Sequence, residues 1–226
     1  FSIQLFAQTF EMIDVNPDGS SVPMDLFTHG GKILFSAYTE DLGYELWVTD
    51  GTSNGTNVLK DININGSSEP SDFFEYEDNV IFSAATSNNL YKIWLTDGTT
   101  EGTRLFKNAD VQWIENRGGF VAFNDLLYFG GSDKLWKTDG TEEGTVKIKN
   151  IVNSFKTKFN DMLIFNGNEY SSGLGNELYK TDGTEVGTVL IKDIRTVGSV
   201  PDNSSNPLDF IEYHGKLYFS ANDGIH

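Results

Sequence analysis

Short hydrophobic runs recur along the chain and are separated by polar turn residues. In many runs the apolar side chains are consecutive, as at 33–35, 80–82, 126–129, 163–165 and 217–219. Neighbouring residues of a strand point to opposite faces, so these runs predict strands in sheets that are covered on both faces. The 3.6-residue period of an amphipathic helix is absent from the sequence. The pattern predicts an all-β chain.

The second repeat illustrates the predicted unit of four strands, at 72–77, 80–86, 90–96 and 104–109. A two-residue turn, Asp78-Asn79, is predicted between its first two strands. The equivalent turns in the other units are Gly30-Gly31, Asn124-Asp125, Asn160-Asp161 and His214-Gly215. These residue types tolerate the positive φ angles of tight hairpins. Each unit therefore reads as an antiparallel meander.

One motif returns four times at the end of the third predicted strand: an aromatic residue, two positions, Asp-Gly-Thr, two positions and Gly-Thr. Its aromatic, aspartate and glycine residues are Trp47, Asp50 and Gly51; Trp94, Asp97 and Gly98; Trp136, Asp139 and Gly140; and Tyr179, Asp182 and Gly183. The aspartates lie 47, 42 and 43 residues apart. Four-stranded units at about this period predict a β-propeller-like tandem repeat.

The region 10–226 divides into units at about 10–62, 63–109, 110–151, 152–194 and a partial unit at 195–226. Residues 10–15 resemble the fourth-strand segments 58–62 and 190–194. The last unit has only its first two strands. We therefore expect a fragment with about four complete blades, a leading fourth strand and a trailing hairpin.

The motif residues are interpreted as structural. The aromatic side chain buries a large area between blades, the aspartate accepts backbone N–H groups of the turn, and the glycine supplies an unusual backbone angle. Catalysis by Asp50, Asp97, Asp139 and Asp182 is disfavoured, because equivalent positions of a repeat would then all have to be catalytic.

Composition narrows the possible partners and the compartment. A formal charge of −17 leaves no positive stripe for nucleic acid, and the absence of cysteine removes thiolate sites. Residues 1–9 resemble the end of an export signal closing at Ala7, or alternatively a short strand. No apolar run of about 18 residues follows, so membrane insertion is not expected.

Two inter-unit loops resemble calcium loops. Their candidate ligands are Asp14, Asn16, Asp18 and Asp25 in the first, and Asp61, Asn63, Asn65 and Asp72 in the second. No helices flank them, and the alternative is an Asx-turn that connects blades. Calcium binding is therefore a secondary hypothesis.

Recognised catalytic motifs are absent. The sequence has no Gly-x-Ser-x-Gly elbow, Walker loop or dinucleotide fingerprint, and His29, His214 and His226 lack metal-ligand spacing. Trp113 and Tyr170 lie outside the repeat pattern and are candidates for stacking on a sugar or peptide. Glu115 and Arg117, in the irregular third unit, are the nearest candidates for an active site.

The four motif copies resemble the bacterial ELWxxDGT repeat, also called the hyalin-like repeat, of large exported proteins. Asp61-Ile62-Asn63 and Phe82-Ser83-Ala84 also fit that repeat, and the resemblance covers residues 10–226. Lys92 and Lys134 replace its leading glutamate, and Tyr179 replaces its tryptophan. The resemblance implies a secreted or cell-surface protein with a propeller-like region and no established catalytic residues.

The sequence favours a non-enzymatic extracellular module for adhesion or for binding a glycan or protein ligand. Its variable loops are 40–43, 87–89 and 169–176. The alternative is a propeller-type polysaccharide hydrolase or lyase, or an accessory domain of one, with carboxylates converging on the axis. Since propellers host both functions, the fold does not decide between them.

Overall fold

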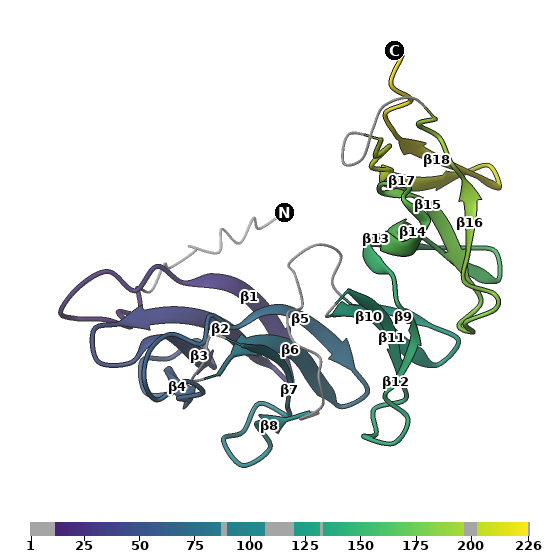
Figure 1. The fold of residues 1–226 in the computed structure, drawn as a ribbon. Helices are drawn as coiled ribbons and strands as arrows, with labels where there is room; N and C mark the ends of the chain where they lie inside the picture. Colours follow the sequence, from purple (N-terminus) through teal and green to yellow (C-terminus); the bar gives the residue numbers. More distant parts are fainter. Residues whose placement is uncertain (1–11, 87–89, 107–119, 132, 197–202, 226) are drawn as a thin grey trace, which may run out of the picture. The chain divides into compact units, whose positions relative to one another are not determined.

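The computed structural model describes residues 12–86, 90–106, 120–131, 133–196 and 203–225 (Figure 1). The described chain is all-β: it contains antiparallel strands, one short 3₁₀ turn, η1 (Tyr170–Ser172), and no α-helix. Among these residues, no helix is long and apolar enough to cross a membrane. The expected fold class, β-propeller-like repeats of four-stranded blades, is confirmed.

Each blade is a meander in which successive strands are hydrogen-bonded neighbours. Blade 1 contains β1 (Met24–His29), β2 (Lys32–Thr39), β3 (Gly43–Thr49) and β4 (Asn57–Lys60). Blade 2 contains β5 (Ser71–Tyr76), β6 (Asn79–Ala85), β7 (Tyr91–Thr96) and β8 (Arg104–Leu105).

Blade 3 contains β9 (Val121–Phe123), β10 (Leu126–Gly131), β11 (Lys134–Thr138) and β12 (Val146–Lys149). Blade 4 contains β13 (Val152–Phe159), β14 (Met162–Asn168), β15 (Glu177–Thr181) and β16 (Val189–Lys192). The fifth sheet has two strands, β17 (Leu208–Tyr213) and β18 (Lys216–Ser220).

Four of the five predicted hairpin turns are in the predicted register. The exception is blade 2, where Tyr76 pairs with Asn79 and the turn is Glu77-Asp78, so the predicted Asp78-Asn79 turn is wrong by one residue. Glu77 takes a φ of 53°, an angle that a glutamate rarely adopts. The expected leading fourth strand is also not formed in its described part, since residues 12–15 belong to no strand.

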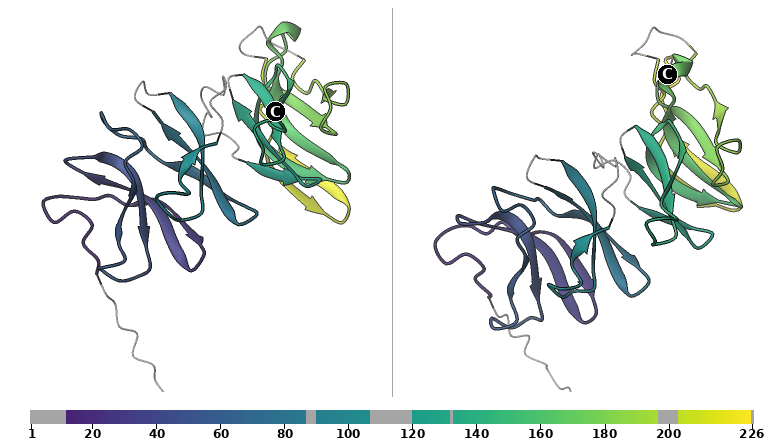
Figure 2. Two further views of the ribbon diagram at one scale, coloured as in Figure 1. Left: turned by 90° about the horizontal axis from the view of Figure 1, so that it is seen from below. Right: turned by 60° about the horizontal axis from the view of Figure 1, so that its bottom comes forward.

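The chain divides into two compact units, and β7 of blade 2 contributes residues to both. Unit 1 comprises residues 1–89 and 95–104, and unit 2 comprises residues 90–94 and 105–226. Within unit 1, β1 lies beside β5, and the ring of Phe27 stacks on that of Phe73 at 6.1 Å. Within unit 2, β13 lies beside β10 and β11 on one side and β17 on the other. Figure 2 shows the β17–β18 hairpin, in yellow, next to the blade 4 sheet.

Burial on both faces of the sheets explains the consecutive apolar residues. Val80, Ile81 and Phe82 are all fully buried on the second strand of blade 2. The motif aromatic lies directly across from the phenylalanine of the second strand, giving the cross-strand pairs Phe35–Trp47, Phe129–Trp136 and Phe165–Tyr179. Such pairs add about 0.5–1.5 kcal/mol beyond the burial of area.

Candidate functional site

The Asp-Gly-Thr loops form one hydrogen-bonded structure that is repeated in all four blades. In each copy the aspartate Oδ1 accepts the backbone N–H of the threonine two residues later, at 2.9 Å, and its hydroxyl, at 2.7 Å. That hydroxyl in turn accepts the N–H of the second glycine. The loop closes through paired threonine hydroxyls, such as those of Thr138 and Thr145 at 2.8 Å.

Steric constraints explain why both of these motif positions are glycine. The first, exemplified by Gly183 with a φ of 91°, adopts a left-handed conformation. A Cβ on the second would overlap the aspartate carboxylate, as Gly187 shows with Asp182. The carboxylate of each motif aspartate is therefore engaged in hydrogen bonds and close packing within its own loop.

The pKa of each motif aspartate lies below its ordinary value of 3.8, mainly because the threonine hydroxyl two residues later donates to the carboxylate and secondarily because of the backbone N–H of the same threonine. A carboxylate with a lowered pKa stays ionised at neutral pH. This environment suits a turn cap and does not suit a general acid, which requires a raised pKa.

These lowered pKa values predict acid sensitivity. An aspartate with a depressed pKa contributes stability that is present above pH 3.8 and is lost as the pH falls through the lower pKa of the folded state. We expect the melting temperature of the chain to fall more steeply below this pH than that of a variant with all four aspartates changed to asparagine. Equal slopes in melting curves from pH 6 to pH 2 would contradict this assignment.

A second repeated structure uses the leading glutamate of the motif to hold the connection to the next blade. Glu45 is fully buried, and its carboxylate accepts the N–H groups of Ile62 and Asn63 and the hydroxyl of Ser68. In blade 4, Glu177 accepts the N–H groups of Ile194 and Ser205 and the hydroxyl of Ser205. Burial raises the pKa of Glu45 above 4.5, although the three donors oppose this shift.

Sequence reasoning missed this role of the glutamate, although a signal for it was present. The two blades with glutamate are followed by connectors that contain a Ser-Ser pair, Ser67-Ser68 and Ser204-Ser205. The two blades with Lys92 or Lys134 at that position lack such a connector. The glutamate and the serine pair therefore belong to one structural device.

The candidate calcium loops lie in these connectors. Asn63 donates its side-chain amide to the Ser67 carbonyl oxygen, and Asn16 makes the equivalent bond to Ser20. Asp14 accepts the N–H of Asn16, which is an Asx-turn contact. No group of three or more His, Cys, Asp or Glu side chains able to hold a metal is present in the described ranges. Asp18, Asp61 and Asn65 lie in the same two loops.

Asp25 and Asp72, the proposed twelfth ligands, lie on β1 and β5 at the β-bulges of these strands. Both have positive φ angles, 53° and 56°, and Asp209 repeats this conformation on β17. Asp72 accepts the hydroxyl of Ser83, and Asp209 accepts that of Ser220. These aspartates follow a Pro-x-Asp pattern at the start of the first strand.

We expect millimolar calcium to leave the melting temperature of the chain unchanged within about 1 °C, because the asparagine side chains of both loops already serve as turn contacts and ligand stabilisation requires a preformed site. A rise in melting temperature that depends on calcium and is lost in Asn63→Ala would support the calcium hypothesis instead. Magnesium at the same ionic strength is the control for general screening.

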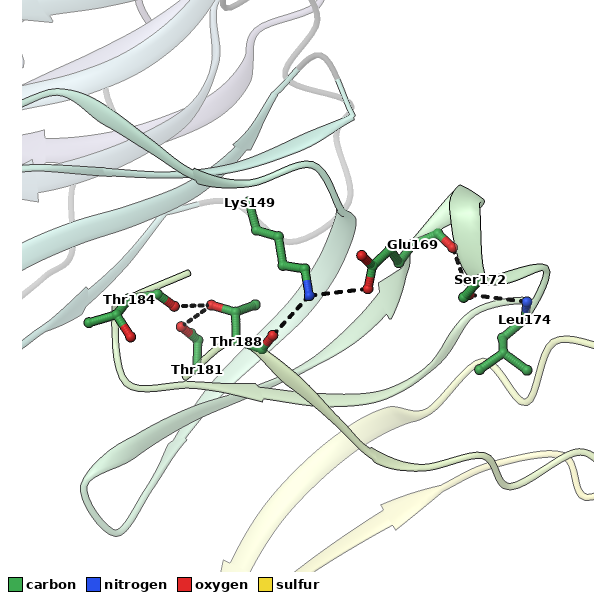
Figure 3. Close-up of polar contacts among 7 residues, drawn as sticks. All are labelled: Lys149, Glu169, Ser172, Leu174, Thr181, Thr184 and Thr188. Atoms are coloured by element: carbon green, nitrogen blue, oxygen red, sulfur yellow. Dashed lines mark hydrogen bonds and ion pairs between the residues drawn. The ribbon is translucent and has the colours of Figure 1, made fainter. Parts of the chain in front are cut away.

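The loop 169–176 of blade 4 is the longest connection between second and third strands within the described blades, and it is fixed from several sides (Figure 3). Lys149 of blade 3 forms an ion pair with Glu169 at 3.1 Å and also donates to the Thr188 carbonyl oxygen. Ser172 donates its N–H and its hydroxyl to the Glu169 carbonyl oxygen, at 2.8 and 2.7 Å. These contacts tie the start of the loop to blade 3 and to its own backbone.

Two further contacts anchor the far end of this loop to the connector that leads to β17. The side-chain amide of Asn203 donates to the Gly173 carbonyl oxygen, and that of Asn176 donates to Asn206 Oδ1. Burial, and secondly the charge of Glu169, raise the pKa of Tyr179, which has replaced the motif tryptophan. Ser171, Ser172 and Gly173 are exposed. The loop presents polar groups on a fixed backbone.

The structure describes only some of the other candidates from the sequence. Trp113, Glu115 and Arg117 lie outside the described residues, as does loop 87–89, and the side chain of Tyr170 is likewise not described. His29 binds Glu75 through Nδ1 at 3.0 Å between blades 1 and 2. His214 lies in the β17–β18 turn.

Comparison with known proteins supports the fold alone. No family model matches the sequence, and no curated protein matches it. Among solved structures, the chain is similar to a puromycin hydrolase mutant, with a TM-score of 0.51, 14% identity, and coverage of 89% of this chain and 33% of that chain. The chain therefore spans about a third of that enzyme's length.

Weaker similarities are to propeller glycosidases. An α-L-arabinofuranosidase from Clostridium thermocellum has a TM-score of 0.34 and 14% identity, with 88% of this chain and 80% of that chain covered. An exo-β-1,3-galactanase from Phanerochaete chrysosporium has a TM-score of 0.39 and 10% identity, with 77% and 50% covered.

Proposed function

We propose that the chain is a non-enzymatic recognition module of a secreted or cell-surface protein that binds a glycan or protein ligand. The observation that carries the proposal is the preformed polar loop 169–176. Lys149 holds the Glu169 side chain, Asn203 donates to the Gly173 carbonyl oxygen, and the Ser204 hydroxyl accepts the Asn176 N–H. Ser171 and Ser172 are exposed. A loop ordered before binding pays little entropy on binding, which favours its use in recognition.

The repeated carboxylates already serve structural hydrogen bonds, which also supports a binding role over a catalytic one. The four motif aspartates cap their own loops, and Glu45, whose pKa is raised, is fully buried behind its connector. A general acid must reach its substrate, and Glu45 has no exposed surface. The export compartment is supported by the segment ending at Ala7 and by the ELWxxDGT-like repeat.

A glycan array probed with the purified chain tests the proposal, with the variant Ser171→Ala as its partner. Ser172 is left unchanged, because its hydroxyl donates to the Glu169 carbonyl oxygen and accepts the Leu174 N–H within the loop. We expect binding of the chain to a defined set of glycans and a loss of about three- to tenfold in Ser171→Ala, since a ligand hydrogen bond contributes about 0.5–1.5 kcal/mol. A protein-interaction screen with the same two proteins tests whether the ligand is a protein instead of a glycan. Binding that the variant retains in full would exclude this loop as the site.

Lys149 offers a matched test of loop positioning. Lys60 makes the same bond between blades, to the Thr103 carbonyl oxygen at 2.9 Å, and among the residues that the structure describes it forms no ion pair. Lys149→Met should therefore weaken ligand binding through the released Glu169, whereas Lys60→Met should not. The stability of Lys149→Met should fall by no more than about 1 kcal/mol beyond that of Lys60→Met, because the Lys149–Glu169 pair is partly exposed.

A second candidate is a polysaccharide hydrolase. It is favoured by the carboxylates of Asp25 and Asp72, which occupy the same bulge position on neighbouring first strands. The similarity to glycosidases is one of fold and adds nothing to this candidate. Release of reducing ends from a polysaccharide panel, abolished in Asp25→Asn/Asp72→Asn, would replace the non-enzymatic proposal with this one.

A further inference from the structure

We infer that the Tyr38–Tyr44 pair and the β2–β3 loop at residues 40–43 form a docking site in blade 1 for a basic segment of a partner protein. An arginine or lysine side chain of that segment would lie on the two tyrosine rings. The inference goes beyond the function proposed above, because it concerns a separate surface, in unit 1, and a cationic partner.

The two tyrosines form an aromatic pair at the end of the β2–β3 hairpin. Tyr38 and Tyr44 are cross-strand partners, so their side chains lie on the same face of the sheet. Their ring centroids are 5.2 Å apart with an interplanar angle of 54°, and both residues are half-buried. Tilted rings that are partly open to solvent offer the electron-rich faces to which a cation is attracted.

This pair is a feature of blade 1 and not of the repeat. Alignment on the phenylalanine of the second strand places Ala85, Ser132 and Asn168 at the position of Tyr38 in the other three blades. Blade 4 has the same buried glutamate and Ser-Ser connector as blade 1, yet it has asparagine at this position. A blade therefore forms without two aromatic residues here, which leaves the pair available for another role.

The backbone of both tyrosines is held by the connectors on either side of the hairpin. The Tyr38 N–H donates to the Ser21 carbonyl oxygen at 2.8 Å. The Tyr44 N–H donates to the Ser67 hydroxyl at 3.0 Å, and the Tyr44 carbonyl oxygen accepts the Ser68 N–H at 2.8 Å. A surface that is ordered before binding loses little entropy when a partner docks.

Exposed carboxylates lie in the loop and in the two connectors at this end of blade 1. They belong to Asp14, Asp18, Glu40, Asp41, Asp61 and Glu69. A Cβ on Gly19 would overlap Glu40 Oε1, so the loop lies against the first connector. The three segments, 12–23, 40–43 and 61–70, contain no lysine or arginine. A cationic ligand on the tyrosines therefore has carboxylates nearby and no competing cation in these segments.

The sequence around this site also holds most of the net charge of the chain. Residues 12–86 contain 13 acidic and two basic side chains, a formal charge of −11 out of −17. Of the two lysines, Lys60 donates to the Thr103 carbonyl oxygen, and Lys32 begins β2, about 23 Å along the strand from Thr39. This field attracts a basic partner and repels an acidic one.

A basic protein segment fits both features better than a glycan does. The guanidinium group of arginine stacks on an aromatic face and pairs with carboxylates, and the ammonium group of lysine is attracted by the same faces. A neutral sugar would stack on the rings but would gain no charge attraction from the carboxylates. The combination of rings and carboxylates thus favours arginine or lysine.

The test uses a synthetic peptide of four Arg-Gly repeats added to the purified full chain. Calorimetry at about 20 mM salt should show saturable one-to-one binding. The affinity should fall at least about tenfold at about 200 mM salt, because salt screens the attraction between charges. A peptide with glutamate in place of arginine should not bind.

Tyrosine variants separate recognition by the rings from general charge attraction. Tyr38→Ala/Tyr44→Ala should weaken binding of the arginine peptide by about tenfold or more, whereas Tyr38→Phe/Tyr44→Phe should stay within about twofold, because phenylalanine keeps the aromatic face. Tyr213→Ala, which removes an exposed tyrosine of unit 2, is the matched control. Circular dichroism of each variant verifies that the blades remain folded.

Acidic variants locate the charged part of the site. Glu40→Gln/Asp41→Asn should weaken binding several-fold and reduce its salt dependence. Glu142→Gln/Glu143→Gln is the matched control, because these residues are an adjacent exposed acidic pair in unit 2, and it should change the affinity by less than about twofold. Equal losses in the two variants would reduce the interaction to diffuse charge attraction and overturn the inference.

Nitration of the wild-type chain gives a readout that does not depend on the folding of a variant. The arginine peptide should protect Tyr38 and Tyr44 from nitration and leave Tyr213 unprotected. Absence of peptide binding, or equal nitration with and without the peptide, would overturn the inference. Glycan binding that Tyr38→Ala/Tyr44→Ala loses while peptide binding persists would assign the tyrosines to a sugar and reject the basic partner.

Discussion

Glu45→Gln is expected to lower the free energy of unfolding by about 2 kcal/mol, measured by urea denaturation at neutral pH. The buried carboxylate accepts from Ile62, Asn63 and Ser68, and an amide has a single oxygen to replace two. Its NH₂ group would face donors. One or more buried N–H groups would thus lose their acceptor.

Glu40→Gln is the control, because Glu40 is an exposed glutamate in the neighbouring loop of the same blade. Its effect should stay within about 0.5 kcal/mol. If the two variants have equal stability, Glu45 does not hold the connector. Hydrogen exchange at residues 61–68 gives a local readout, which should accelerate in Glu45→Gln alone.

The same glutamate makes a pH-dependent contribution. Burial raises the pKa of Glu45 in the folded chain above 4.5, so the folded state binds the proton more tightly than the unfolded state. Its contribution to stability is thus largest below pH 4.5 and falls as the pH rises through the folded pKa. The difference in stability between the wild type and Glu45→Gln should follow this direction, which is opposite to that of the motif aspartates.

Trp136→Ala is expected to cost about 4 kcal/mol of stability, the other large effect in this chain. The indole is 8% exposed, lies almost parallel to Phe129 at a centroid distance of 6.4 Å, and donates Nε1–H to the Gly131 carbonyl oxygen at 3.0 Å. Its removal leaves a cavity between packed strands. Denaturant unfolding that monitors blade 3 measures the loss.

Two phenylalanine variants separate packing from hydrogen bonding. Trp136→Phe loses the bond to Gly131, whereas the indole Nε1 of Trp47 is buried and has no partner among the described residues. Trp136→Phe should therefore be more destabilising than Trp47→Phe by about 1 kcal/mol. Equal losses would indicate that packing alone fixes the tryptophan.

Local patterns predicted the architecture of the blades. Consecutive apolar residues indicated sheets covered on both faces, and Gly-Gly, Asn-Asp and His-Gly pairs located four hairpin turns in register. Blade 2 departs because its turn uses Glu77, which carries no conventional turn signal, so Asp78-Asn79 looked more favourable. Turn propensity is a local preference, and the pairing of Tyr76 with Asn79 outweighs it.

Contacts between residues far apart in the sequence could not be predicted from local sequence patterns. Asp25 and Asp72 match the twelfth position of a calcium loop by spacing, and their place in β-bulges on first strands was not predicted. Glu45 and Ser68 are 23 residues apart and belong to different elements, so no periodicity links them. Only the joint occurrence of glutamate with the Ser-Ser connector within this one chain could have revealed the pair.

Because of the buried glutamate, the repeat unit that can be duplicated intact does not coincide with a single blade. A duplicated or engineered segment cut at the blade edges would separate Glu45 from Ser68, or Glu177 from Ser205. The buried carboxylate would then lack its hydrogen-bond donors. Each exchanged segment should instead begin within the second strand of one blade and end after the proline that follows the serine pair. The glutamate and the serine that it binds then remain in the same segment.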